Sequence, residues 1–132
     1  MVHQQPTQLR VIDAPDDCQN APRKLVVRDF LVALYQRDIE SIRAMLREDI
    51  RWEIVGSEAF DDLDQVLGWV QQQAAVDELH ITTVITHGTD CAADGWIIGA
   101  DGSTTRFCHI LVFAGHAKSA KIKTLRTYRI DT

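Results

Sequence analysis

Residues 91–113 read CAADGWIIGADGSTTRFCHILVF, and this stretch decides the fold. Two long segments rich in β-branched and aromatic residues flank Asp101-Gly102, a pair typical of a two-residue type I′ hairpin turn. The stretch therefore predicts an antiparallel hairpin in which the residues on either side of the pair face each other. On that register His109 lies opposite Asp94, and the two side chains share one face of the sheet.

The same strand pattern continues on both sides of this hairpin. Short turns separate four segments at about 79–87, 91–100, 103–114 and 119–130, which predicts an antiparallel meander. The lysines that alternate along the last segment must face water, so the other side of that strand is expected to face inward. With the short strand at 50–55, the predicted inner face carries Asp94, Trp96, Phe107, His109, Thr124, Arg126, Tyr128, Trp52 and Ile54.

Upstream of the meander, apolar residues recur at helical spacing and predict three helices. Asn20 is expected to cap the first helix, Asp38 the second, and Asp62 the third, where Gln65 completes a capping box. Residues 1–19 lack such periodicity and are expected to form a flexible N-terminal tail or a loosely docked arm. The sequence thus predicts an α+β fold, with a single domain over residues 20–132.

Charge and composition describe an ordinary globular domain. The chain has 132 residues, 14 Lys and Arg, and 19 Asp and Glu, for a formal net charge of -5. Nucleic-acid binding needs a clustered basic surface, so no nucleic-acid partner is expected. Because there is no apolar run of about 18 residues and no signal-peptide pattern at the N-terminus, we expect no membrane partner and a cytoplasmic location.

Cysteine and histidine spacing gives no sign of a metal centre. The three cysteines are odd in number and form no CxxC pair, and the five histidines show no His-x-His spacing. No glycine-rich phosphate loop is present. We therefore expect neither a metal nor a cofactor.

Three segments carry a resemblance to a known family: FLVALYQRD at 30–38, LREDIRWEIVG at 46–56 and KIKTLRTY at 121–128. With the order of helices and strands, they resemble the nuclear transport factor 2-like superfamily, in its SnoaL-like and ketosteroid-isomerase-like branch. The resemblance implies a conical barrel whose curved antiparallel sheet wraps around three N-terminal helices and encloses a small-molecule pocket. It also implies a homodimer through the outer sheet face.

The acidic residues of the enzymes in that superfamily are not matched. The isomerase base corresponds to Ile54 here, its first-helix tyrosine to Phe30, and its second pocket acid to His109. The last-strand acid of limonene-epoxide-hydrolase relatives corresponds to Thr127. No specific activity therefore follows from the resemblance.

Two functions remain open at this stage. In the first, the protein binds a hydrophobic oxygenated or cyclic metabolite, and any catalysis is cofactor-free acid/base chemistry of an isomerase, cyclase or hydrolase. His109, oriented by Asp94, would be the base and Arg126 would stabilise an oxyanion. In the second, the protein is a non-catalytic dimeric binding or regulatory module with a vestigial cavity.

Each candidate residue also has a purely structural interpretation. His109 and Asp94 could form a simple cross-strand hydrogen bond, Arg126 an ion pair, and the aromatic residues ordinary core. For the first function the expected ligand-binding residues are Phe30, Trp52, Ile54, Trp96, Phe107, Thr124 and Tyr128. The expected dimer interface is Arg106, Cys108, Ile110 and Val112, an apolar patch on the outer face that needs cover.

Overall fold

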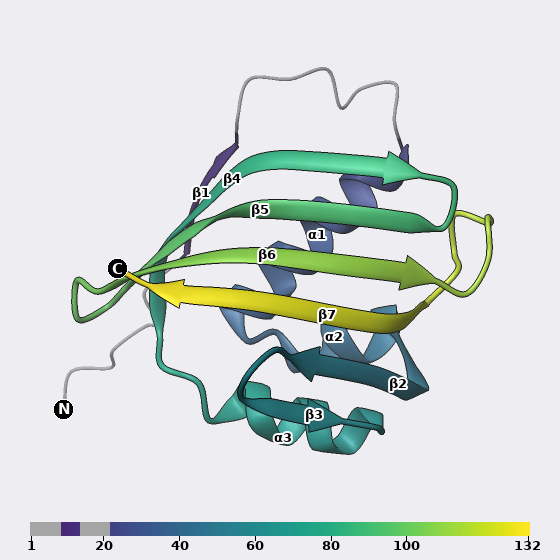
Figure 1. Cartoon of the computed structure of the whole chain (residues 1–132), viewed down its shortest axis with the longest axis horizontal. Helices are drawn as coiled ribbons and strands as arrows, with labels where there is room; N and C mark the ends of the chain where they lie inside the picture. The colour runs from purple at the N-terminus through teal and green to yellow at the C-terminus, as the bar shows by residue number, and fades with distance from the viewer. Residues whose placement is uncertain (1–8, 14–21) are drawn as a thin grey trace, which may run out of the picture.

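The computed structural model describes residues 9–13 and 22–132, which form three helices against a seven-stranded sheet (Figure 1). The helices are α1 (Pro22–Gln36), α2 (Ile39–Met45) and α3 (Leu63–Gln71). The strands are β1 (Arg10–Asp13), β2 (Leu46–Ile54), β3 (Glu58–Phe60), β4 (Val76–His87), β5 (Asp90–Gly99), β6 (Thr104–Phe113) and β7 (Ile122–Asp131). In these ranges no helix has the length and apolar character needed to cross a bilayer.

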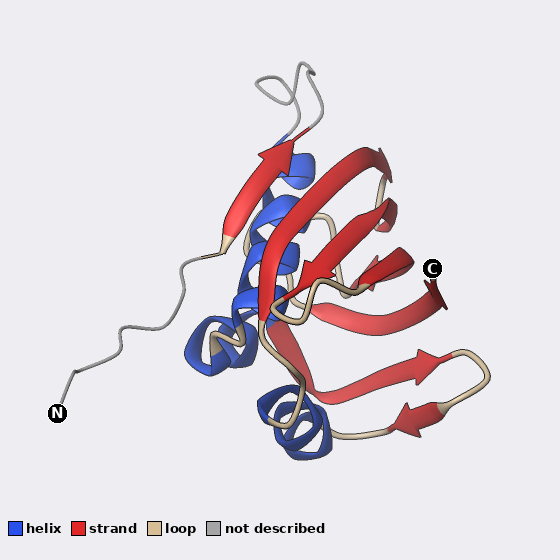
Figure 2. Cartoon of the chain, turned by 90° about the vertical axis from the view of Figure 1, so that its left-hand side faces the viewer, coloured by secondary structure: helices blue, strands red, loops and turns tan. Residues whose placement is uncertain are grey.

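The sheet is mixed, with the strand order β1-β4-β5-β6-β7-β2-β3. Strands β4 to β7 form the predicted antiparallel meander, while β1 pairs in parallel with β4 and β2 in parallel with β7. Figure 2 shows the long strands bending around the helices, which cover one face only. The predicted α+β architecture is confirmed, but the sheet ends at β1 and β3 and does not close into a barrel.

Two of the predicted helix caps, at the starts of α2 and α3, are confirmed. A carboxylate oxygen of Asp38 accepts from Ser41 N at 3.2 Å, and one of Asp62 accepts from Gln65 N at 2.8 Å. Each bond satisfies a backbone donor that the first helical turn would otherwise leave free. The predicted Asn20 cap lies outside the described residues.

The turn after β5 has three residues instead of two, and this corrects the predicted register. Gly99 N donates to Ser103 O at 2.8 Å, and Gly102 N donates back to Gly99 O at 2.9 Å. Gly102 has a φ of 84°, the left-handed conformation that closes a type I turn with a one-residue bulge. The pairing is therefore offset by one residue from the predicted one.

Because side chains alternate between faces, a slip of one residue moves every side chain of one strand to the other face. Asp94 lies opposite Cys108, and His109 lies opposite Ala93. Asp94 and His109 therefore point to opposite faces, and the predicted pair does not form. Trp96 likewise lies on the outer face, opposite Arg106.

The side chains of strand β7 also point to the opposite faces from those predicted. Phe113 pairs with Ile122 but Val112 pairs with Thr124, so Lys123 is an extra residue in the ladder. Beyond this bulge Thr127 pairs with His109 on the inner face. Thr124, Arg126 and Tyr128 accordingly lie on the outer face, and their predicted inward orientation is wrong.

The range expected to be an N-terminal tail contains a strand. Arg10–Asp13 pairs with Glu78–Ile81 at the edge of the sheet, and Leu9 is buried. For residues 9–13 the flexible tail is corrected to a segment docked on the sheet, and the rest of 1–19 lies outside the described residues. A four-residue edge strand is too short to show a hydrophobic period in the sequence. It is stabilised by pairing with its partner strand and not by its own residues.

Gly95 generates a test of the β4–β5 pairing. It is buried in β5 opposite Ile81, where a Cβ atom would overlap the carbonyl oxygen of His80. We predict that Gly95→Ala lowers the free energy of unfolding by about 1–3 kcal/mol, as overpacking does elsewhere. The matched control is Gly68→Ala in α3, where a Cβ meets nothing and alanine favours the helix. Urea unfolding of both variants measures this, and equal stabilities would contradict the pairing.

Candidate functional site

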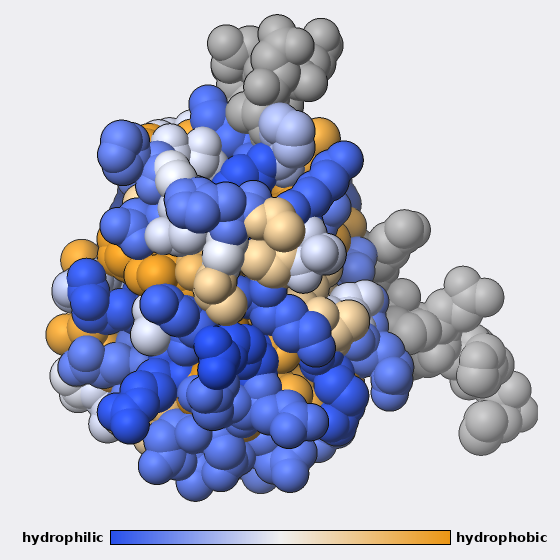
Figure 3. Space-filling view, turned by 90° about the vertical axis from the view of Figure 1, so that its right-hand side faces the viewer, coloured by the Kyte–Doolittle hydropathy of each residue, from blue (hydrophilic) through white to orange (hydrophobic). Residues whose placement is uncertain are grey.

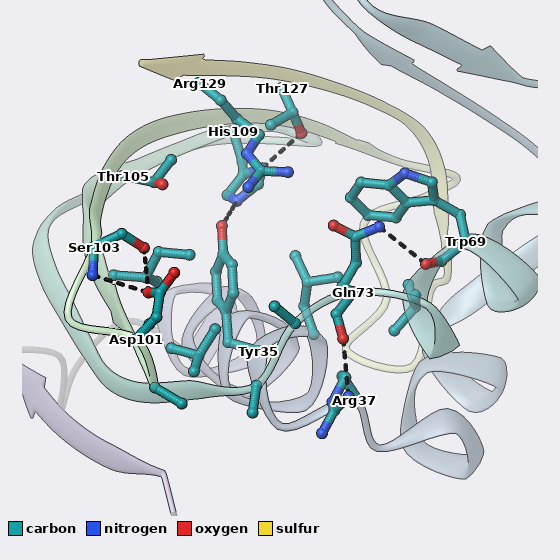
Figure 4. A pocket seen from close by; sticks show the side chains of 18 of the residues that line it. Tyr35, Arg37, Trp69, Gln73, Asp101, Ser103, Thr105, His109, Thr127 and Arg129 are labelled. Carbon is teal, nitrogen blue, oxygen red and sulfur yellow. Dashed lines mark hydrogen bonds between the residues drawn. The ribbon is translucent and has the colours of Figure 1, made fainter. Parts of the chain in front are cut away.

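A cavity of about 270 Å³ lies between the inner face of the sheet and the C-terminal ends of α1 and α3 (Figure 4). Helices and strands both contribute apolar lining: Leu34, Trp52, Trp69, Val70, Val76 and Ile97. Into this apolar space project the polar side chains Tyr35, His109, Thr127 and Arg129. Apolar walls with a few convergent polar groups are typical of small-molecule sites.

Tyr35 reaches the cavity from the last turn of α1. The helix ends in a Schellman motif, in which Asp38 N donates to Ala33 O at 2.9 Å. Arg37 takes the left-handed position of that motif, with a φ of 58°, where glycine is usual. Its guanidinium donates to the carbonyl of Gln73 at 2.8 Å, which ties the end of α1 to the segment after α3. These contacts fix the direction in which Tyr35 projects.

Four side chains from four separate elements, α1, β2, β6 and β7, form one hydrogen-bonded series. Trp52 Nε1 donates to Thr127 Oγ1 at 2.8 Å, and Thr127 Oγ1 lies 2.7 Å from His109 Nδ1. His109 Nε2 lies 2.8 Å from Tyr35 Oη. Trp52, Thr127 and His109 are each 1% exposed, so these bonds have no competition from bulk water. We call this series the Trp52–Tyr35 chain.

The positions of the hydrogens follow from the donor inventory. The Trp52 indole can only donate, so Thr127 Oγ1 accepts from it. If Thr127 Oγ1 also accepted from His109 Nδ1, its own buried hydrogen would have no partner among the described residues, at a cost of about 1–3 kcal/mol. The satisfied arrangement has Thr127 donating to Nδ1 and Nε2–H donating to Tyr35 Oη. The Tyr35 hydroxyl hydrogen is then free to point into the cavity.

Burial keeps both ring systems of this chain neutral. Burial and, less strongly, the positive charge of Arg129 lower the pKa of His109 from 6.5 to about 3. Burial raises the pKa of Tyr35 above its ordinary value, an effect that Arg129 partly opposes. At neutral pH His109 is therefore an uncharged ring with both nitrogens engaged, and Tyr35 keeps its hydroxyl proton.

The cavity mouth carries charged side chains. Arg129 follows Thr127 by two residues on β7, and Figure 4 shows its guanidinium on the side of the cavity where Tyr35 meets His109. Asp101, in the β5–β6 turn, accepts from Ser103 Oγ at 2.6 Å and Ser103 N at 2.9 Å. These two bonds, of which the one from the Ser103 hydroxyl has the larger effect, hold the pKa of Asp101 below its ordinary value. Asp101 is thus an ionised carboxylate of which one oxygen, Oδ1, is already hydrogen-bonded.

Three predicted site residues do gather at the cavity. His109 and Trp52 line it, and Phe107 packs behind it. The Phe107 ring lies 5.3 Å from Tyr35 and 4.9 Å from His109, centroid to centroid. Two other predicted residues, Phe30 and Ile54, are buried in the core and do not line the cavity.

The remaining predicted site residues lie on the outer face. Trp96 stacks on His80 with ring centroids 4.4 Å apart, and Tyr128 is 43% exposed. Thr124 and Arg126 line a second hollow of about 540 Å³ beside β2 and β3, and half of its lining residues are exposed. With Asp94 also outside, no catalytic set of His109, Asp94 and Arg126 is assembled.

Several residues of the cavity were not among the predicted site residues: Tyr35, Arg37, Trp69, Gln73, Asp101, Ser103, Thr105 and Arg129. Tyr35 could have been found, since it lies four residues after the buried Leu31 on the same helix face. In residues 9–13 and 22–132 no group of three His, Cys, Asp or Glu side chains is arranged to hold a metal ion.

Comparison with solved structures identifies the fold. An NTF-2-like protein of unknown function from Burkholderia xenovorans superposes with a TM-score of 0.73 at 11% identity, covering 88% of each chain. A putative ketosteroid isomerase from Kribbella flavida gives 0.66 at 18% identity, covering 84% of this chain and 79% of that one. An epoxide hydrolase of M. tuberculosis, described as LEH-like, gives 0.63 at 20% identity, covering 85% of each.

These likenesses establish that the chain has the nuclear transport factor 2-like fold, as the sequence resemblance implied. No family model matches the sequence, and no curated protein matches it. The fold hosts both proteins of unknown function and enzymes, so function must be argued from the site.

The buried neutral state of His109 predicts a pH-dependent stability. The unfolded chain binds a proton at this imidazole below pH 6.5, and the folded protein does not until about pH 3. The free energy of unfolding should therefore fall by up to about 1.4 kcal/mol per pH unit as pH drops below 6.5. His109→Gln should flatten this dependence between about pH 7 and 5.

The control is His87→Gln, which removes an exposed histidine at the end of β4. Denaturant unfolding at a series of pH values gives the slope for each protein. A slope that is the same with and without the His109 imidazole would show that this ring is not buried in its neutral form.

Proposed function

We propose that the protein binds a small, largely apolar molecule in the cavity and that the Tyr35 hydroxyl donates a hydrogen bond to an oxygen of that molecule. The observation that carries the proposal is the Trp52–Tyr35 chain of close contacts, which ends at the cavity. In the hydrogen arrangement assigned above from the donor inventory, all its hydrogens run in one direction, toward the cavity. A donor held in this way is preorganised, because binding does not have to reorient it.

The cavity favours a compact ligand. Its volume of about 270 Å³ is close to the lower end of the range for small-molecule sites, which is roughly 300–1,000 Å³. Trp52 and Trp69 meet edge to face, with centroids 5.3 Å apart, and offer an aromatic wall. Desolvating a flat apolar molecule against such a wall supplies binding energy, and the Tyr35 hydroxyl supplies orientation.

In this proposal His109 is a positioning residue for Tyr35. The hypothesis that it is a general base needs a free ring nitrogen and a pKa near neutrality. Both nitrogens have partners within 2.8 Å, and burial brings the pKa to about 3. Acid/base chemistry in this cavity would instead use the Tyr35 hydroxyl to polarise a carbonyl group of the ligand.

The alternative, a regulatory module with a vestigial cavity, is less well supported. A vestigial cavity is expected to be filled by apolar side chains, with its polar groups satisfied internally. Here the space is open and lined by Tyr35, Arg37, Asp101 and Arg129. In the hydrogen arrangement above, the Tyr35 hydroxyl hydrogen also remains available to a ligand.

Matched ligands with and without a carbonyl test the role of Tyr35. Wild-type protein should bind acetophenone or acetylnaphthalene more tightly than ethylbenzene or ethylnaphthalene. Tyr35→Phe should weaken ketone binding about 2–10-fold, the value of one neutral hydrogen bond, and leave hydrocarbon binding unchanged. Quenching of tryptophan fluorescence or calorimetry measures each dissociation constant.

Tyr128→Phe is the control for this experiment. Tyr128 is the chain's other tyrosine and lies exposed on the outer face. It should keep the wild-type preference for the ketones. Failure of the wild-type protein to bind any of the four compounds, or a preference that survives in Tyr35→Phe, would contradict the proposal.

We further propose that the outer face is a homodimer interface. Arg106, Cys108, Ile110 and Val112 lie on this face, as predicted. Ile85, Tyr128 and Ile130 add large apolar side chains that are 58%, 43% and 66% exposed. Figure 3 shows hydrophobic residues at its left side, among hydrophilic ones. The outer face also carries both signs of charge, so a second copy can complement it.

Sedimentation measures this association. The wild-type protein should sediment as a dimer at micromolar concentration, and Ile130→Lys should shift it toward monomer because a lysine would be buried between the copies. Leu25→Lys on α1, which replaces a side chain 44% exposed away from the sheet, should remain dimeric. A monomeric wild-type protein would refute the interface.

A further inference from the structure

We propose that the molecule bound in the cavity is an organic acid whose carboxylate is held by the Arg129 guanidinium and the Tyr35 hydroxyl. This inference rests on the proposed ligand-binding function and names the chemical class of the ligand. It arises from the position of Arg129, which neither the fold nor the binding of an apolar molecule requires.

Arg129 is placed to meet a ligand. Its neighbour Thr127 is hydrogen-bonded to His109, and Arg129 comes two residues later on the same side of β7, opposite Phe107. Figure 4 shows its guanidinium and the Tyr35 hydroxyl converging on one side of the cavity. Arg129 therefore stands over the end of the Trp52–Tyr35 chain, where the oxygen of a ligand would lie.

The guanidinium of Arg129 is available for a ligand. Within the described residues no carboxylate lies within 4.0 Å of it, which is also true of other arginines such as Arg37 and Arg126, whereas Arg10, Arg28, Arg43 and Arg47 each have an acidic neighbour. The one acid among the described lining residues is Asp101, whose Oδ1 is already taken by Ser103. Arg129 is an exposed residue at the cavity mouth, so water solvates its guanidinium when no ligand is bound, and a ligand carboxylate would replace that water with charge-assisted hydrogen bonds.

The two donors together fit a carboxylate better than a neutral carbonyl. A guanidinium presents parallel N–H groups that match the two oxygens of a carboxylate. The Tyr35 hydroxyl can donate to one of the same oxygens. The positive charge of Arg129 also acts on the groups at the base of the site, where it contributes to lowering the pKa of His109 and opposes the rise in the pKa of Tyr35. An anion placed there would therefore be stabilised by that field.

The apolar part of the cavity limits the size and polarity of the rest of the ligand. Trp52, Trp69, Leu34 and Ile97 surround the space beyond the two donors with apolar surface. An acid with a small cyclic or aromatic body fits this division, with its charge at the mouth and its ring against the tryptophans. Long acyl chains do not fit a volume of about 270 Å³.

Binding of matched acids and amides tests this inference. The probes are benzoate against benzamide and naphthoate against naphthamide, which share shape and differ in charge. The wild-type protein should bind each carboxylate at least about ten-fold more tightly than its amide. Arg129→Gln should remove that preference while keeping amide binding, and raising the ionic strength should weaken carboxylate binding only.

Arg126→Gln is the matched control, because Arg126 lies on the same strand but on the outer face. It should keep the wild-type preference for carboxylates. Equal binding of acid and amide by the wild-type protein, or a preference that persists in Arg129→Gln, would overturn the inference and leave the proposed function intact. Binding of neither acid nor amide by the wild-type protein would contradict the proposed function together with the inference.

Discussion

The site depends on one constraint, which is that an imidazole is buried without its charge. His109 is 1% exposed, so charging it would cost far more than the protein can recover unless a partner carboxylate were present. The chain instead surrounds it with neutral hydroxyl groups from Thr127 and Tyr35. Once the ring is neutral and both nitrogens are used, its chemistry is to orient other groups. Because the Trp52 indole can only donate, the arrangement that satisfies the Thr127 hydroxyl then sets the direction of every hydrogen bond from Trp52 to the cavity.

That constraint links secondary structure to ligand binding. Thr127 can meet His109 only because the bulge at Lys123 sets the faces of β7, and Tyr35 can meet it only because α1 ends where it does. The Schellman motif at Arg37 accepts an unfavourable φ of 58° to make that ending. The bulge at Lys123 and the Schellman motif at Arg37, far apart in the sequence, thus together position the Tyr35 hydroxyl.

The sequence predicted much of the fold and part of the site. Hydrophobic periodicity and the side chains of Asp38 and Asp62 were enough for the helices and their starts. Phe107 and His109 were correctly predicted to face inward, although the predicted pairings with β5 and β7 from which this was inferred were both wrong. Thr127 lines the cavity but was not predicted to do so, because the predicted register turned its side of β7 outward.

The faces of Asp94, Trp96 and Arg126 could not be predicted in the same way. Asp101-Gly102 is compatible with a two-residue turn and with a three-residue turn that ends in a left-handed glycine, and the two differ by one residue in register. Nothing local distinguishes them, since Trp96 is apolar enough for either face. On the outer face the Trp96 ring is covered by His80, which stacks on it, and by the Arg106 guanidinium, which lies 5.3 Å from the ring centroid. The extra residue at Lys123 depends likewise on the loop before β7, which has no regular pattern.

The most direct test of the account is the protonation state of the His109 ring. Long-range ¹H–¹⁵N correlation NMR of the imidazole nitrogens at neutral pH distinguishes the two neutral tautomers from the charged ring. We expect a neutral ring with hydrogen on Nε2 and none on Nδ1, which leaves the Tyr35 hydroxyl free to donate. A charged ring, or hydrogen on Nδ1, would reverse the hydrogen bonds and contradict the account.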